Sequence, residues 1–102
     1  MPYKVVFRPE AEADLLALYR YISSAGGLLR AGVYIERIET ACMSLATFPE
    51  RGTCRDDIAP GIRVIGFERR VSIAFRVLNE AVEIVSIAYA GREFEGELRE
   101  ED

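Results

Sequence analysis

The first residues of the chain carry apolar side chains at every second position. Within residues 1–8, the positions Tyr3, Val5 and Phe7 are separated by single residues, and a period of two is typical of a β-strand. Pro9 follows and favours the first position of a helix, where the N–H that proline lacks would have no partner. The sequence therefore predicts a strand that leads directly into a helix.

Two longer stretches repeat apolar residues with the spacing of a helix. The first begins at Pro9 with acidic residues in its first turn, which suit the positive end of a helix dipole, and the Ser and Gly residues of 23–27 predict its end. The second covers residues 28–48, and Pro49 predicts its end. Because the link is short, the pair predicts an antiparallel helical hairpin. The expected buried positions are Ala11, Leu15, Leu18 and Ile22 in the first helix, and Ala31, Ile35, Ile38, Cys42, Leu45 and Phe48 in the second.

Three runs of β-favouring residues complete the pattern. They cover residues 62–67, 70–78 and 82–90, and the links Glu68-Arg69 and Asn79-Glu80 are short enough for hairpins. The three runs therefore predict an antiparallel meander. The resulting fold class is α+β, a single domain of order β-α-α-β-β-β in which a helical hairpin packs on an antiparallel sheet.

The last of these runs is apolar on both faces. Simple alternation places Val82, Ile84 and Ala88 on one face, and Val85, Ile87 and Tyr89 on the other. Two helices cover one face of a small sheet, so the other face is predicted to be an apolar surface that binds a partner. The alternative is a curled sheet that buries both faces within one chain.

Charge is divided unevenly along the chain, whose 102 residues and 11.4 kDa suit one domain. The net charge is −4, but residues 93–102 carry six acids and one Arg, so residues 1–92 have a net charge of +1. A nearly neutral body gains little from counterion release, which disfavours strong sequence-independent binding to nucleic acid. Lys4 is the sole lysine and the other twelve cations are Arg, a residue suited to bidentate contacts with carboxylate or phosphate.

Several classes of chemistry are excluded by residues that the chain lacks. No histidine is present, so Ser-His-Asp, Cys-His and His-metal sites cannot form. Cys42 and Cys54 are too few for a structural zinc site, and without a secretory signal they are expected to be free thiols. The sequence contains neither of the glycine motifs that bind nucleotide phosphates, GxGxxG and GxxxxGK(S/T). No metal or cofactor is therefore expected, and the lack of an apolar run of about 18 residues predicts a cytoplasmic protein that does not enter a membrane.

The remaining candidate site is a surface rich in arginine, beside the predicted middle strands and at the end of the last one. Its residues are Arg63, Arg69, Arg70, Arg76, Tyr89, Gly91 and Arg92. Arg with Tyr can hold phosphate and stack on bases, and the same residue types dominate protein interfaces. A third interpretation is a solvated face with scattered ion pairs. The residues alone leave these alternatives open.

Several short segments follow one another in an order and spacing that characterise a known family. They are Phe7-Arg8-Pro9-Glu10-Ala11-Glu12-Ala13-Asp14-Leu15, Tyr21-Ile22, Pro49-Glu50-Arg51-Gly52, Arg55-Asp56-Asp57-Ile58, Pro60-Gly61-Ile62-Arg63, Phe75-Arg76-Val77 and Gly91-Arg92. Together with the element order, these segments resemble the ParE toxins, which belong to the RelE/ParE superfamily of bacterial type II toxin–antitoxin systems. The resemblance covers residues 3–94. It implies a toxin domain at residues 1–94, and the acidic residues that follow form a tail at residues 95–102 that is not part of the family pattern.

The resemblance implies a toxin that blocks DNA replication by poisoning DNA gyrase without performing chemistry, and that a ParD-type antitoxin holds inactive. On this interpretation Arg63, Arg69, Arg70, Arg76, Gly91 and Arg92 bind the target, and Val85, Ile87 and Tyr89 bind the antitoxin. RelE-type relatives instead cut messenger RNA on the ribosome, and that alternative assigns catalysis to Arg63, Arg76, Tyr89 and Arg92. The near-neutral body and the single lysine favour the ParE interpretation. A further alternative is a domain that has lost its target and acts only in repression of its operon.

Overall fold

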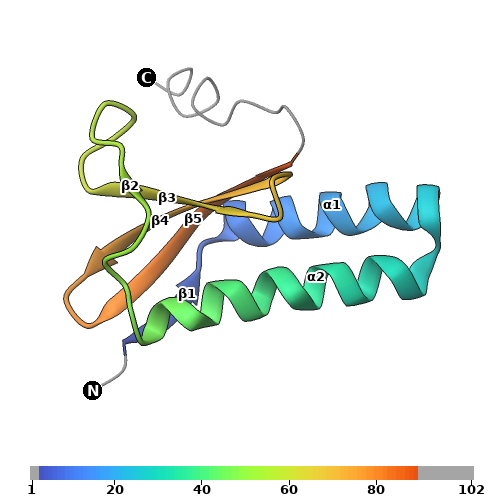
Figure 1. The fold of residues 1–102 in the computed structure, drawn as a ribbon, viewed down its shortest axis with the longest axis horizontal. Coiled ribbons are helices and arrows are strands. Elements are labelled where there is room, and N and C mark those ends of the chain that lie inside the picture. The colour runs from blue at the N-terminus through green and yellow to red at the C-terminus, as the bar shows by residue number, and fades with distance from the viewer. Residues whose placement is uncertain (1–2, 90–102) are drawn as a thin grey trace.

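Two helices lie side by side on one face of a five-stranded sheet (Figure 1). The computed structural model describes residues 3–89 of the chain. The elements are β1 (Lys4–Phe7), α1 (Pro9–Gly26), α2 (Leu28–Met43), the 3-10 helix η1 (Ser44–Ala46), β2 (Thr53–Cys54), β3 (Ile62–Phe67), β4 (Val71–Leu78) and β5 (Ala81–Tyr89). This arrangement confirms the predicted α+β fold with its helical hairpin and its C-terminal meander. The predicted division into residues 1–94 and 95–102 extends beyond the described residues.

The sheet is mixed, whereas the sequence predicted antiparallel pairing throughout. Its strand order is β1-β5-β4-β3-β2. The pairs β2–β3, β3–β4 and β4–β5 are antiparallel, but β1 runs parallel to β5, with Lys4 opposite Ala81 and Phe7 opposite Ile84. The helical hairpin acts as the long crossover that a parallel pair requires. A period of two indicates a strand but not its direction, and the two-residue strand β2 is too short to produce such a pattern.

The helical hairpin turns more sharply than the sequence predicted. Helix α1 begins at Pro9 as expected but continues to Gly26. The hydroxyls of Ser23 and Ser24 donate to the carbonyls of Arg20 and Tyr21, at 3.1 and 2.9 Å, so both serines fit inside the helix. Gly27 alone makes the link, with φ of 94°, a conformation that glycine adopts without steric penalty.

The second helix ends earlier than predicted. Helix α2 stops at Met43 and continues as η1, whose tighter winding breaks the helical period. Leu45 is still fully buried, but Phe48, which was expected on the buried stripe, is 67% exposed. The prediction for Phe48 was therefore wrong, because the period of 3.6 residues does not extend past the end of α2.

A β-bulge in β5 changes which face each of its side chains occupies. Ala74 pairs with Ser86 and the next residue, Phe75, pairs with Ile84, so Val85 is an extra residue without a partner. One inserted residue moves every later side chain to the opposite face. Val82 and Ile84 before the bulge, and Ile87 and Tyr89 after it, therefore all pack on the helix side. This corrects the predicted assignment of these residues to the two faces, since the simple alternation fails at Val85.

Helix α1 also covers the edge of β5 beyond the end of β1. The β1 pairing ends at Ile84. Farther along β5, the carboxylate of Asp14 accepts a hydrogen bond from the Ile87 backbone N–H at 2.9 Å and another from the Ser86 hydroxyl at 3.3 Å. A side chain of α1 therefore satisfies an N–H that a neighbouring strand would otherwise bind.

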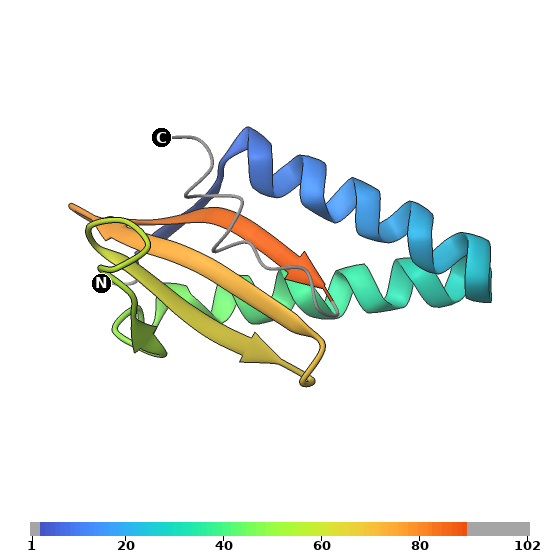
Figure 2. The ribbon, with the colours of Figure 1, turned by 90° about the horizontal axis from the view of Figure 1, so that it is seen from above.

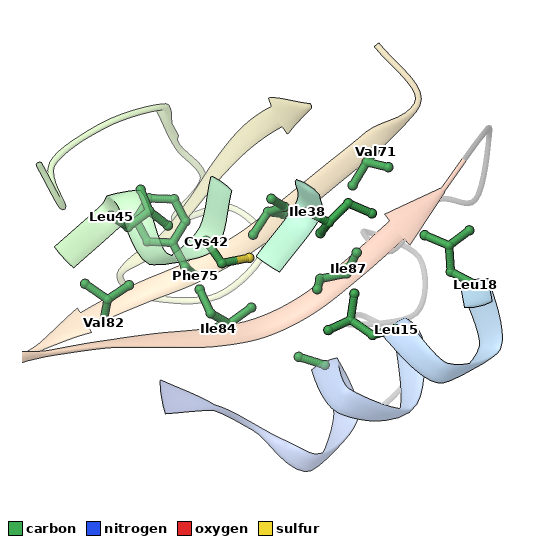
Figure 3. Close-up of a cluster of buried hydrophobic side chains, with 12 residues drawn as sticks. Leu15, Leu18, Ile38, Cys42, Leu45, Val71, Phe75, Val82, Ile84 and Ile87 are labelled. Atoms are coloured by element: carbon green, nitrogen blue, oxygen red, sulfur yellow. The ribbon is translucent and has the colours of Figure 1, made fainter. Parts of the chain in front are cut away.

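The core lies between the helices and the sheet (Figure 3). Its centre contains Ile38 and Cys42 from α2, packed against Phe75 and Ile84 from the central strands, all with no exposed surface. The predicted buried positions Ala11, Leu15 and Leu18 of α1 are confirmed. A second, smaller cluster lies on the other face of the sheet, where the buried residues are Ile62, Ala74 and Ala88.

Candidate functional site

The predicted site residues within the described chain lie at two separate ends of β4. Arg69 and Arg70 precede Val71, which pairs with Tyr89, whereas Arg76 lies near the far end of the strand. Five residues of extended chain separate Val71 from Arg76, roughly 17 Å. In Figure 2 the turn between β3 and β4 lies at the same end of the sheet as the end of β5. We call this the β3–β4 turn end, and the other the β4–β5 turn end.

At the β4–β5 turn end, Arg76 is held by an acid on the neighbouring strand. Its Nη2 donates to Oε1 of Glu83 at 2.8 Å, and Nη1 of Arg8 lies 3.5 Å from Oε2 of the same carboxylate. The hydrogen bond from Arg76, followed by the charges of Arg76 and Arg8, holds the pKa of Glu83 below its ordinary value despite partial burial. Nε of Arg76 is buried without a hydrogen-bond partner. Glu83 of β5 therefore links Arg76 of β4 to Arg8, the residue before α1.

Arg63 does not join Arg76, although the two lie on neighbouring strands. Ile62 pairs with Arg76, and Arg63 pairs with Phe75, so the two arginines point to opposite faces of the sheet. Arg63 is half-buried, and its Nη1 donates to the carbonyl of Arg51 at 3.4 Å. Its observed contact is thus with the loop that leads into β2.

The β3–β4 turn end contains a cluster of aromatic rings. Tyr34 of α2 lies edge-on to Phe67, with ring centroids 6.0 Å apart, and edge-on to Tyr89 at 6.4 Å. Tyr21 of α1 packs against Tyr89 at 5.7 Å. The guanidinium of Arg37 lies 5.7 Å from the Phe67 ring centroid, a cation–π geometry. The cluster fastens both helices to the last residues of β3 and β5.

Next to these rings is a pocket with basic side chains, which we call the Arg70 pocket. It lies between the helical hairpin and the β3–β4 turn, and its lining residues are Ile22, Arg30, Tyr34, Glu68, Arg70 and Tyr89. Glu68 forms an ion pair with Arg37. Among residues 3–89, no carboxylate forms an ion pair with Arg30 or Arg70. The pocket therefore presents two cations beside two tyrosines.

The phenol of Tyr34 reports on the electrostatics of this pocket. Burial raises the pKa of Tyr34 above its ordinary value, and Tyr89 raises it further, whereas the charges of Arg37 and Arg70 oppose the shift. Tyr34 therefore keeps its proton at neutral pH and can donate a hydrogen bond. A ligand with negatively charged oxygens would meet cations and a hydroxyl donor in one place.

The turn at this end has an unusual backbone. Glu68 and Arg69 have φ of 50° and 65°, and a two-residue hairpin turn with both values positive favours Asn and Gly. Two charged residues with large side chains stand there instead. The turn places Arg69 and Arg70 at an exposed tip, next to the Arg70 pocket.

The residues predicted to bind an antitoxin do not form one surface. Ile87 is 3% exposed and belongs to the helix-side core, so it cannot offer a free contact. Val85 is half-buried beside the smaller cluster on the other face, and Tyr89 lies in the aromatic cluster. The bulge at Val85 accounts for this separation. Gly91 and Arg92, which were predicted to bind the target, lie outside the described residues.

Exposed apolar side chains gather instead on the outer surface of the helices. Leu16 lines a groove between α1 and α2 with Tyr19, Gly32 and Ile35, and Glu36 and Glu39 stand at its side. Leu16 is half exposed and Leu29, near the hairpin tip, is 83% exposed. The sequence contains this signal, because these leucines are large apolar residues that lie off the buried stripes of the two helices.

Neither cysteine forms a disulfide or belongs to a metal-binding group of side chains within the described part of the chain. Cys42 and Cys54 are both free, and Cys42 is a fully buried core residue, as predicted, in which burial raises the pKa of the thiol to about 12. Residues 3–89 contain no group of three or more acidic or cysteine side chains arranged to hold a metal ion. In the same part of the chain, neither helix has the length and apolar character needed to cross a membrane.

Comparison with known proteins identifies the family. The sequence matches the family described as ParE toxin of type II toxin-antitoxin system, parDE, over residues 5–94. A search of curated proteins finds no match. Among solved structures, the chain is similar to one from the chromosomal ParDE toxin–antitoxin system of Pseudomonas aeruginosa, with a TM-score of 0.76 and 26% identity over 86% of this chain and 96% of that one.

Two further structures share the fold at lower identity. One belongs to the toxin–antitoxin complex RelBE2 from Mycobacterium tuberculosis, with a TM-score of 0.58 and 20% identity over 87% of this chain and 99% of that one. The other is a mutant of the Escherichia coli toxin RelE in the free state, with a TM-score of 0.63 and 16% identity over 99% of this chain and 97% of that one. Because the family match covers most of the sequence, the chain belongs to the ParE toxin family of type II toxin–antitoxin systems.

Proposed function

We propose that this chain is a cytoplasmic toxin that inhibits DNA gyrase by binding it, and that a ParD-like antitoxin neutralises it. The family match over residues 5–94 carries this proposal. The similar Pseudomonas aeruginosa chain also comes from a ParDE system. An inhibitor of this kind needs a shaped and charged surface, and it needs no group that transfers protons.

The separation of the candidate catalytic residues supports inhibition without chemistry. General acid–base catalysis requires its groups within hydrogen-bond reach of one reacting centre. Arg76 is engaged with Glu83, Arg63 points to the other face of the sheet, and Tyr89 lies at the far end of β5. The ribonuclease alternative would therefore have to be served by residues that the fold keeps apart.

The antitoxin is proposed to cover the groove between α1 and α2. An exposed apolar groove with acidic residues at its side fits an amphipathic partner helix whose polar face carries cations. Leu16 is central to this proposal because its side chain is half exposed within the groove. Leu16→Glu should weaken the antitoxin complex at least tenfold, a loss of about 1.4 kcal/mol, and Leu16→Met should retain binding.

The experiment that tests the target is a comparison of synthesis rates in the minutes after the chain is induced in bacteria without an antitoxin. If thymidine incorporation falls before methionine incorporation, gyrase inhibition is supported. Purified chain should then inhibit gyrase supercoiling in vitro. If methionine incorporation falls first, the proposal is wrong and the ribonuclease alternative takes its place.

The ribonuclease alternative makes a separate prediction about Tyr89. If Tyr89 donates a proton during RNA cleavage, Tyr89→Phe should lower the rate at least tenfold. If Tyr89 is a packing residue, the same substitution should leave inhibition of the target within about twofold, since the ring and its contacts are retained. The two results are distinguished by measuring ribosomal mRNA cleavage and gyrase supercoiling with the same preparation.

A further inference from the structure

The Arg70 pocket has the composition of a site for carboxylates. Arg30 and Arg70 line it without an ion-pair partner among residues 3–89, and Glu68 is engaged by Arg37 outside the pocket. Guanidinium groups bind carboxylates through paired hydrogen bonds. The phenols of Tyr34 and Tyr89 add two hydroxyl donors beside the cations.

The chain itself supplies carboxylates next to this pocket. Tyr89 lines the pocket and is the last described residue, and residues 93–102 contain six acids against one Arg. Glu93 is four residues beyond Tyr89, which is at most about 14 Å of extended chain. A ligand tethered this closely has an effective concentration in the millimolar range.

We propose that the Arg70 pocket is a carboxylate-binding site and that its occupant is the acidic segment at residues 93–97 of the same chain. The carboxylates of Glu93, Glu95 and Glu97 would engage Arg30 and Arg70. The apolar wall that Ile22 gives the pocket offers a contact for an intervening side chain such as Phe94. The negative charge of this segment complements the basic Arg70 pocket. The β4–β5 turn end offers no such match, because Arg76 and Arg8 already share Glu83 there.

This contact has a consequence for target binding, which rests on the proposed function. Arg70 belongs both to the pocket and to the surface predicted to bind the target. An acidic segment seated on Arg70 would compete with any acidic surface of a target. Neutralising the segment should therefore strengthen inhibition of gyrase, most clearly at low ionic strength, where charge interactions are least screened.

The direct test uses the scarcity of lysine in this chain. Lys4 is the sole lysine, so Arg70→Lys places a new amine in the pocket while keeping its positive charge. A carbodiimide joins such an amine to a carboxylate only when the two are in contact. Arg51→Lys is the matched control, because Arg51 is exposed, contacts Ser44 and precedes β2, the edge strand that β3 and β4 separate from β5.

In the full chain, the lysine at position 70 should couple to residues 93–97 at least about tenfold more than the lysine at position 51, and about 1 M salt should abolish the difference. Coupling to Glu68, two residues away, is counted separately. Equal coupling of both lysines to the acidic segment would overturn the proposal. So would coupling of position 70 to a carboxylate of a bound antitoxin in place of residues 93–97.

A second measurement observes the pocket without cross-linking. The variant Glu93→Gln/Glu95→Gln/Glu97→Gln should shift the ring signals of Tyr34 and Tyr89 in NMR spectra. The control Glu100→Gln/Glu101→Gln/Asp102→Asn, which removes the same charge farther along, should leave them in place. Unchanged signals in both variants would contradict the contact. Neither readout involves gyrase, so a failure of the proposed function and a failure of this inference are distinguishable.

Discussion

The two ends of the sheet use the same residue type in opposite ways. At the β4–β5 turn end, Arg76 donates a hydrogen bond to Glu83, and Arg8 approaches the same carboxylate. At the β3–β4 turn end, Arg70 and Arg30 stand beside tyrosines with no carboxylate partner among residues 3–89. The first arrangement holds strands together, and the second leaves charge available for a ligand. An arginine-rich sequence is therefore not by itself a binding surface, because its partners decide what each cation does.

The bulge at Val85 allows apolar residues from both ends of β5 to pack against the same two helices. Without the extra residue, either the pair Val82 and Ile84 or the pair Ile87 and Tyr89 would face away from the helices. Deleting Val85 should therefore lower the free energy of unfolding by at least about 3 kcal/mol, because one end of β5 loses its core contacts. Urea unfolding followed by circular dichroism measures this change.

The control for the deletion is Val85→Ala, which keeps the residue count. This substitution should lower stability by about 1 kcal/mol, since Val85 is only half-buried. If the deletion and the substitution have similar effects, the bulge is not what directs Ile87 and Tyr89 into the core.

The next largest effect is expected at the paired end. Glu83→Gln removes the charge that binds Arg76 and leaves a guanidinium that is 32% exposed without its counter-charge. The free energy of unfolding should fall by about 2 kcal/mol, as for hydrogen bonds to charged groups. The matched substitution at the other end, Arg70→Gln, should change stability by less than about 0.5 kcal/mol because the side chain is exposed. Equal losses at both ends would contradict the contrast between them.

The ion pair between Arg76 and Glu83 should make the free energy of unfolding depend on pH. The pKa of Glu83 is lowered in the folded chain, mainly by the hydrogen bond from Arg76. Its stabilising contribution is therefore complete above the unfolded pKa and is lost as pH falls through the folded value. The stability difference between the wild-type chain and Glu83→Gln should be constant near neutral pH and shrink below the ordinary value of 4.5. Thermal unfolding of both chains across this range tests the sign, and a difference that grows in acid would refute it.

The smallest effect concerns the turn that presents Arg69 and Arg70. Replacing Glu68-Arg69 by Asn-Gly should raise the free energy of unfolding by about 0.5–1 kcal/mol, because both positions have positive φ. The lost ion pair between Glu68 and Arg37 is largely exposed and contributes little. Asn79→Ala tests the same argument in reverse, with a loss of about 1 kcal/mol at φ of 54°. If inhibition also falls in the Asn-Gly variant, the charged turn is retained for function at the expense of stability.

Much of the fold could be predicted from local pattern, and less of the candidate site. The helical stripes, the start of α1 at Pro9 and the hairpins at residues 68–69 and 79–80 depend on neighbours within a few positions. The prediction that Val85, Ile87 and Tyr89 share one antitoxin-binding face depends on an unbroken alternation along β5, which the bulge interrupts. The Arg70 pocket depends on residues from α1, α2, the β3–β4 turn and β5, and no local pattern links them.

The sequence by itself determined the order of elements, the buried faces of the helices and the absence of histidine chemistry, because periodicity and composition act locally. Only the tertiary structure decided that β1 pairs in parallel with β5, that Arg76 meets Glu83, and that Arg30 and Arg70 share a pocket with Tyr34 and Tyr89. Strand direction, register and charge partners arise from contacts between residues far apart in the chain, and such contacts leave no periodic signal in the sequence.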